Sequence, residues 1–256
     1  MNCRIVLATA TALALLPRAG LQAQQPMPGD YPIHSMDRPA PAVVTPGTRA
    51  TDPPSDAIVL FDGKNLDAWA GDSGHKAPWL VRDGYVEVAP GSGSIQTRQG
   101  FGDCQLHIEW VEPAPASGEG QERGNSGVYL MGLYEVQVLD SYQNRTYADG
   151  QAGALFGQYP PLVNSARPAG EWQSYDIIFH GPRFDGAGKL LAPARVTVVM
   201  NGVVVQDHVA LTGPTAYQRR PPYAAHPDRL PLSLQDHEMR VRYRNIWIRN
   251  LPSSRP

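Results

Sequence analysis

The residues best suited to chemistry lie in the run YEVQVLD at 134–140. Side chains alternate along a strand, so Glu135 and Gln137 face one side and the two valines face the other. In a β-sandwich the valine side is the core, so the Glu and Gln side chains point outward. Placed side by side on a sheet, they can bind sugar hydroxyls. Asp140 joins this face only if a bulge adds a residue.

The spacing of this run is similar to the Glu-x-Asp-x-x-Glu motif of laminarinase-like sandwich glycosidases. Glu135 matches the first carboxylate, but Gln137 replaces the middle Asp and the shorter Asp140 replaces the last Glu. A retaining glycosidase needs two carboxyl groups about 5 Å apart, one of them a proton donor. A laminarinase-like hydrolase is therefore an alternative that the sequence only partly fits.

Other polar side chains follow the same alternation. In HIEW, His107 and Glu109 share a face, and in LQDHE, Gln235 and His237 share a face. Further outward candidates are Asn125, at the start of a strand, and Arg244, in the last one. Each has a structural alternative: His237 could hold a turn, and Arg244 could pair with a buried carboxylate. Their convergence near strands flanked by long loops favours a binding site.

Recognised metal and nucleophile motifs are missing. The seven His residues are scattered without an HExxH motif, and neither a Gly-rich phosphate loop nor a GxSxG elbow occurs. No cofactor is predicted, although a divalent metal held by residues distant in sequence stays open as an alternative.

The segments that carry these side chains are predicted to be β-strands. Gly and Pro are abundant, at 25 each, and about a dozen short strand-like runs lack sustained helical periodicity. Asp83-Gly84 and Asn201-Gly202 are strong two-residue hairpin signals. The pattern predicts an all-β jelly-roll sandwich. Three long loops are expected around one concave sheet, at Glu112–Arg123, Ser141–Ser165 and Thr212–Leu232.

The N-terminus resembles a secretory signal peptide over residues 1–23, with Arg4, an apolar run and a small residue at Ala23. The apolar run of about 12 residues is too short to span a bilayer, so no membrane span is expected after cleavage. We expect a periplasmic or secreted protein, with a Pro-rich arm at 24–56 and a single domain at 57–256.

Cysteine and charge limit the function further. After cleavage Cys104 is the only cysteine, so no internal disulfide is expected, and its strand-like context predicts a buried thiol. The net charge of −2 predicts no nucleic-acid partner. The oligomeric state is not predicted.

From about residue 57 to the end, the chain resembles the 3-keto-disaccharide hydrolase domain family. No single motif carries the resemblance. It rests on several segments in order, which are LFDGKNLDAW (60–69), WLVRDGYVEV (79–88), FGDCQLHIEW (101–110), RGNSGVYL (123–130), YEVQVLD (134–140), GEWQSYDI (170–177), NGVVV (201–205), LQDHE (234–238) and YRNIWIRNL (243–251).

The resemblance implies a concanavalin A-like fold and cleavage of glycosides already oxidised at C3. A C3 ketone acidifies the C2 proton; a base removes it, and the enolate expels the aglycone from C1. Such an enzyme needs one placed base, a donor for the enolate oxygen and a proton for the leaving group. It does not need paired carboxylates. A non-catalytic carbohydrate-binding module, which binds sugars on the same face, is an alternative.

Roles for the candidate residues follow as hypotheses. The base is His237 or Glu135, which spacing alone does not rank. Asp140 would orient a partner or donate a proton. The side chains expected to bind the carbohydrate substrate or the developing oxyanion are Glu109, Asn125, Gln137, Gln235 and Arg244.

Overall fold

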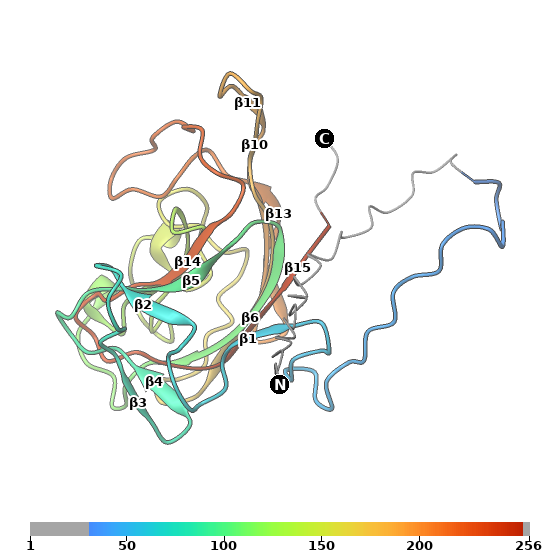
Figure 1. Cartoon of the computed structure of the whole chain (residues 1–256). Helices are drawn as coiled ribbons and strands as arrows, with labels where there is room; N and C mark the ends of the chain where they lie inside the picture. The colour runs from blue at the N-terminus through green and yellow to red at the C-terminus, as the bar shows by residue number, and fades with distance from the viewer. Residues whose placement is uncertain (1–30, 253–256) are drawn as a thin grey trace, which may run out of the picture.

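The computed structural model describes residues 31–252 (Figure 1). The predicted signal peptide at 1–23 lies outside the described residues, so export stays a prediction. Residues 31–56 form no strand or helix, and every strand of the described chain lies between Ile58 and Asn250. No helix in the described part of the chain is long and apolar enough to cross a membrane.

The strands form a two-sheet antiparallel sandwich, so the predicted all-β sandwich is confirmed. The large sheet has the order β13-β12-β9-β6-β15-β4-β3, with β1 beside β15. Its strands are β1 Ile58–Phe61, β3 Leu80–Arg82, β4 Tyr85–Glu87, β6 Cys104–Val111, β9 Gln173–His180, β12 Arg195–Met200, β13 Val203–Ala210 and β15 Arg242–Asn250.

The small sheet has the order β2-β5-β14-β7-β8. Its strands are β2 Trp69–Gly71, β5 Ile95–Phe101, β14 Leu230–Leu234, β7 Ser126–Leu130 and β8 Tyr134–Val138. A separate hairpin joins β10 Arg183–Phe184 to β11 Leu190–Ala192, and two 3-10 turns lie at Gly120–Glu122 and Ala148–Gly150.

Turn residues fix the register of the hairpins. Asp83-Gly84 and Asn201-Gly202 both have positive φ at their two central positions, which matches the twist of the flanking strands. They join β3 to β4 and β12 to β13, as predicted. A third turn, at Met131-Gly132, joins β7 to β8 and pairs Tyr129 with Glu135.

The core lies between the two sheets. Val136, Val138 and Ile108 are fully buried in it, which confirms the predicted inner face. Cys104 is a free, buried thiol, and burial raises its pKa to about 12, so it behaves as a small apolar residue. The outer face of each sheet is left to carry polar side chains.

Candidate functional site

Strand β8 is the edge of the small sheet, and its polar side chains point away from the core. Glu135 and Gln137 are nevertheless almost fully buried, because two long loops cover this edge. The backbone of Gln137 exchanges hydrogen bonds with Gly153 and Ala154, and the Thr215 hydroxyl accepts a bond from the Glu135 amide. These two loops were both predicted to be functional, and the third, Glu112–Arg123, also borders the site through Gln121 and Glu122.

Glu135 lies at the centre of a polar network. The Tyr129 hydroxyl donates to Glu135 Oε2 at 2.8 Å, and Gln235 Nε2 donates to the Tyr129 hydroxyl at 3.3 Å. The Gln137 amide nitrogen, turned toward its acceptors, donates to Glu135 Oε1 at 3.0 Å and to the Ser126 carbonyl at 3.1 Å. Tyr129 and Gln137 thus hold the carboxyl group in a fixed position, and Gln235 in turn holds Tyr129.

Burial changes the acidity of this carboxyl. Glu135 is 3% exposed, and the loss of solvation raises its pKa to about 7, against the opposing hydrogen bond from Tyr129. A carboxyl group that is half ionised near neutral pH can both take up and release a proton. This is the property expected of a general base or acid.

A glycine opposite Gln137 makes room for this carboxyl group. Gly127 pairs with Gln137 across β7 and β8. A Cβ added at Gly127 would lie 2.5 Å from Glu135 Oε1 and 2.8 Å from the Tyr129 ring. The missing side chain therefore allows Glu135 and Tyr129 to meet above the sheet.

The network lines a cavity of about 780 Å³ on the outer side of the small sheet. The structure brings five predicted site residues together at its wall: Asn125, Glu135, Gln137, Gln235 and His237. Asn125 is buried and donates to the Gln121 carbonyl at 2.9 Å. Gln235 Oε1 is buried without a hydrogen-bond partner among the described residues, so this acceptor of the network is unused. His237 is exposed at the rim.

Tyr129 and the aromatic side chains of this cavity were not among the predicted site residues. Tyr129 could have been found by pairing SGVYL with YEVQV around Met131-Gly132, which places it opposite Glu135. The loop residues Tyr147, Phe156 and Tyr217 also line the cavity. The sequence carries no comparable signal for them, because irregular loops have no register to read.

Asp140 does not join this site. It follows β8, is buried, and its Oδ2 accepts a hydrogen bond from Arg123 Nε at 2.6 Å. Its Oδ1 accepts from the backbone amide of Tyr142 at 3.2 Å. Asp140 lines a different cavity from Glu135, so the bulge needed to bring it onto the same face does not occur.

Glu109, predicted to bind the same substrate as Glu135, does not share a face with it. Glu109 lies on β6 and Arg244 on β15, on the outer side of the large sheet, across the core from β8. Alternation separates inward from outward residues, but each sheet of a sandwich has its own outer face. The predicted substrate-binding residues therefore fall into two groups on opposite sides of the molecule.

A β-bulge builds the second group. The register of β15 against β6 shifts between Arg244 and Trp247, and Asn245 adopts positive φ. Both Arg244 Nε and Asn245 Nδ2 then donate to the Glu109 carboxylate, at 2.6 and 2.9 Å. Asn245 Nδ2 and Trp247 Nε1 also donate to the Thr51 carbonyl, which fastens the Pro-rich arm to the large sheet.

His107 completes this second group as a buried cation. Its Nδ1 lies 2.7 Å from Asp176 Oδ1, its Nε2 lies 3.7 Å from Glu109 Oε1, and its ring stacks on Trp247. Burial opposes the charge, but the hydrogen bond to Asp176 and the nearby carboxylate of Glu109 outweigh it and raise the pKa of His107 to about 9. These contacts link β6, β9 and β15 to one another.

We expect His107 to make stability depend on pH. Its folded pKa lies above its unfolded value, so its contribution is complete below about pH 6.5 and is lost as pH rises through about 9. The shift corresponds to a contribution on the order of 3 kcal/mol. Denaturant unfolding of wild type and His107→Gln at pH 6 and pH 10 checks this. A His107→Gln variant that loses stability with pH as steeply as wild type would contradict it.

Metal ligands are not grouped in the described structure. Among residues 31–252, no three His, Cys, Asp or Glu side chains are arranged so that they could hold a metal ion.

A family model, the 3-keto-alpha-glucoside-1,2-lyase-like domain, matches residues 56–249. A curated relative, the 3-keto-disaccharide hydrolase of Bacteroides thetaiotaomicron, is 25% identical over 159 residues, covering 48% of this chain and 52% of the relative. The chain thus spans about half the length of that protein.

Solved structures include a protein of Parabacteroides distasonis predicted to be a glycosyl hydrolase. It is 46% identical, with a TM-score of 0.82, and the match covers 88% of this chain and 100% of that one. A second such protein from the same organism shares the fold, at 19% identity and a TM-score of 0.58, over 77% of this chain and 94% of that one.

Proposed function

Because this chain belongs to the 3-keto-alpha-glucoside-1,2-lyase-like domain family, we propose that it cleaves 3-keto-glycosides by proton abstraction at C2. The family is carbohydrate-active, and its curated relative is named as a hydrolase of 3-keto-disaccharides. One observation supports the proposal most: a buried carboxyl group with a pKa near 7, Glu135, lies in a cavity large enough for a sugar.

The proposed reaction begins when the Glu135 carboxylate removes the C2 proton, which the C3 ketone acidifies. The electron pair of the C–H bond forms the enolate, with its negative charge on the C3 oxygen. The enolate then re-forms the ketone and a C1=C2 double bond, and the C1–O bond breaks. The aglycone leaves with that electron pair and takes up a proton. Addition of water across C1=C2 gives net hydrolysis.

The neighbours of Glu135 fit the remaining tasks. Donors that face a developing oxyanion stabilise it and lower the barrier. Asn125 is a buried amide in the same cavity and is the candidate donor to the C3 oxygen or to a neighbouring hydroxyl, while both N–H groups of Gln137 are taken by Glu135 and Ser126. His237, exposed at the rim, is the second candidate for proton transfer, to the leaving group or from C2.

A laminarinase-like mechanism finds less support in this geometry. It needs a second carboxyl group about 5 Å from the first. Asp140, the sequence candidate for that group, is paired with Arg123 beside another cavity. Proton abstraction beside a ketone needs only one base, which Glu135 can supply.

Incubation with matched sugars tests the proposal. We expect turnover of a 3-keto-disaccharide and no release of product from the same disaccharide without the ketone, measured by chromatography. Cleavage of the unoxidised sugar would favour a laminarinase-like hydrolase. Binding without turnover of either sugar would favour a carbohydrate-binding module and overturn the proposal.

A further inference from the structure

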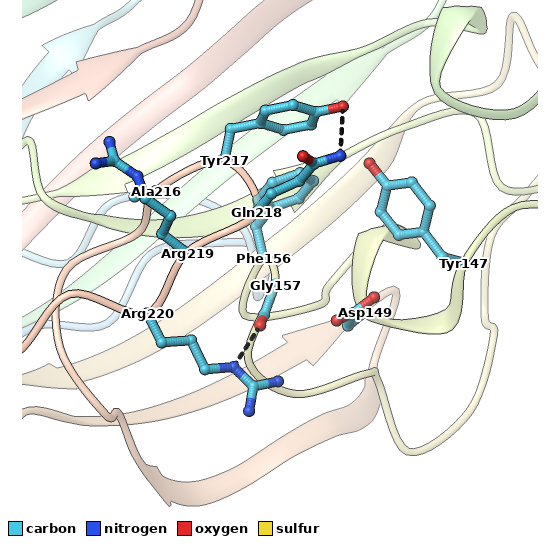
Figure 2. Close-up of a pocket in the computed structure, with 9 residues that line it drawn as sticks. All are labelled: Tyr147, Asp149, Phe156, Gly157, Ala216, Tyr217, Gln218, Arg219 and Arg220. Atoms are coloured by element: carbon cyan, nitrogen blue, oxygen red, sulfur yellow. Dashed lines mark hydrogen bonds between the residues drawn. The ribbon is translucent and has the colours of Figure 1, made fainter.

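A second cavity adjoins the cavity that holds Glu135. It has a volume of about 570 Å³ and is shown in Figure 2. Four residues of the two long loops line both cavities: Tyr147, Phe156, Ala216 and Tyr217. The two cavities are therefore neighbouring parts of one depression, with aromatic side chains at the boundary.

The boundary exposes an unusual amount of aromatic surface. Tyr217 is 70% exposed and Tyr147 is 46% exposed, although large side chains of this kind are usually packed in a folded domain. Phe156 meets the Tyr147 ring edge-on, with ring centroids 6.2 Å apart. Aromatic side chains left open beside a polar site are typical of ligand contacts.

The loop residues are held in place by their own hydrogen bonds. Gln218 Nε2 donates to the Tyr217 hydroxyl at 3.2 Å, and Arg220 Nε donates to the Gly157 carbonyl at 3.0 Å (Figure 2). The Arg220 bond joins the loop that carries Tyr217 to the loop that carries Tyr147 and Phe156.

We propose that this second cavity is the aglycone subsite and that it selects leaving groups with a planar aromatic ring. The inference rests on the proposed function: a sugar ring bound over Glu135 must send its C1 substituent out of the first cavity, and the second cavity adjoins it. The aglycone would stack on Tyr147 and Tyr217.

The lining suits a planar aromatic ring. It combines three aromatic rings, on which such an aglycone can stack, with the polar side chains of Asp149, Gln218, Arg219 and Arg220. The two guanidinium groups are cations that interact well with aromatic faces. A phenol is also more acidic than a sugar hydroxyl, so it leaves with less help from an acid.

The test compares three 3-keto-glucosides that differ only in their aglycone, namely methyl, 4-hydroxyphenyl and glucosyl. For wild type we expect the lowest KM with the aryl compound. In Tyr217→Ala and Tyr147→Ala, the aryl-to-methyl ratio of kcat/KM should fall by about two- to tenfold, because an aromatic pair contributes that much. Tyr217→Phe should keep the ratio. Tyr142→Ala is the matched control, since Tyr142 is a partly exposed tyrosine outside both cavities.

Equal losses for the aryl and methyl substrates would overturn the subsite. A larger loss for the glucosyl substrate than for the aryl one would show that the cavity holds a sugar and would also overturn it. If wild type cleaves none of the three, the proposed function fails. The subsite is then tested by calorimetric measurement of the binding of the aryl compound. Its affinity must fall in Tyr217→Ala and stay unchanged in Tyr142→Ala.

Discussion

Replacing Glu135 with Gln is expected to lower kcat/KM for a 3-keto-glucoside by about 10²–10⁴-fold, the range that general base catalysis contributes. The change keeps the shape of the side chain and removes its ability to take up a proton. Because burial raises the pKa of Glu135 to about 7, wild-type kcat/KM should rise with pH through about 7 and then level off. The variant should lose this rise.

The control for this experiment is His237→Gln, at the rim of the same cavity. We expect a smaller loss than in Glu135→Gln and an inflection that stays near pH 7. If His237→Gln loses more activity and abolishes the inflection, His237 is the base and the assignment to Glu135 is wrong. Steady-state kinetics of both variants from pH 5 to pH 9 separates the two outcomes.

Measuring the stability of Glu135→Gln shows whether the variant loses activity because it is less well folded. The folded pKa of Glu135 lies above its unfolded value, so its contribution to stability is present below about pH 4.5 and is lost as pH rises through about 7. Ionising this carboxyl in the folded protein is therefore costly. Glu135→Gln should be at least as stable as wild type at pH 8, so a loss of activity there reports on chemistry.

Much of the fold could be predicted from local rules. Asp83-Gly84 and Asn201-Gly202 specify tight turns with positive φ, and alternation of valines with polar residues in β8 specifies one inner side. Both rules depend only on neighbouring residues and on the geometry of a strand. The order of the strands within each sheet depends on contacts between residues distant in sequence, and no local rule gives it.

The site was partly predictable for the same reason. Glu135 and Gln137 lie side by side on one strand, so alternation alone brings them together. Glu109 is also outward-facing and buried, yet it lies on the other sheet, where Arg244 and Asn245 hold it. Alternation carries no information on which sheet a strand joins. The position of Asp140 is set by Arg123, a partner that strand spacing cannot reveal.

Replacing Gln137 with Glu is expected to raise the pH at which kcat/KM levels off by roughly two units, because two carboxyl groups at this distance cannot both ionise. The Gln137 amide lies 3.0 Å from Glu135 Oε1. A carboxylate there would hold Glu135 protonated at neutral pH. Activity at pH 7 should then fall by roughly fiftyfold and recover in part toward pH 9.

Gln137→Met separates charge from the loss of a hydrogen bond, since Met has a similar length and no charge. Both variants remove the donor to Glu135, but only Gln137→Glu adds a negative charge in a buried site. We therefore expect the inflection to move by less than about one unit in Gln137→Met, with any loss of activity present at every pH. Equal inflections in the two variants would show that position 137 does not act on the ionisation of the base. In that case the amide of Gln137 would serve only to bind the sugar, and the base would lie farther from it than Glu135 does.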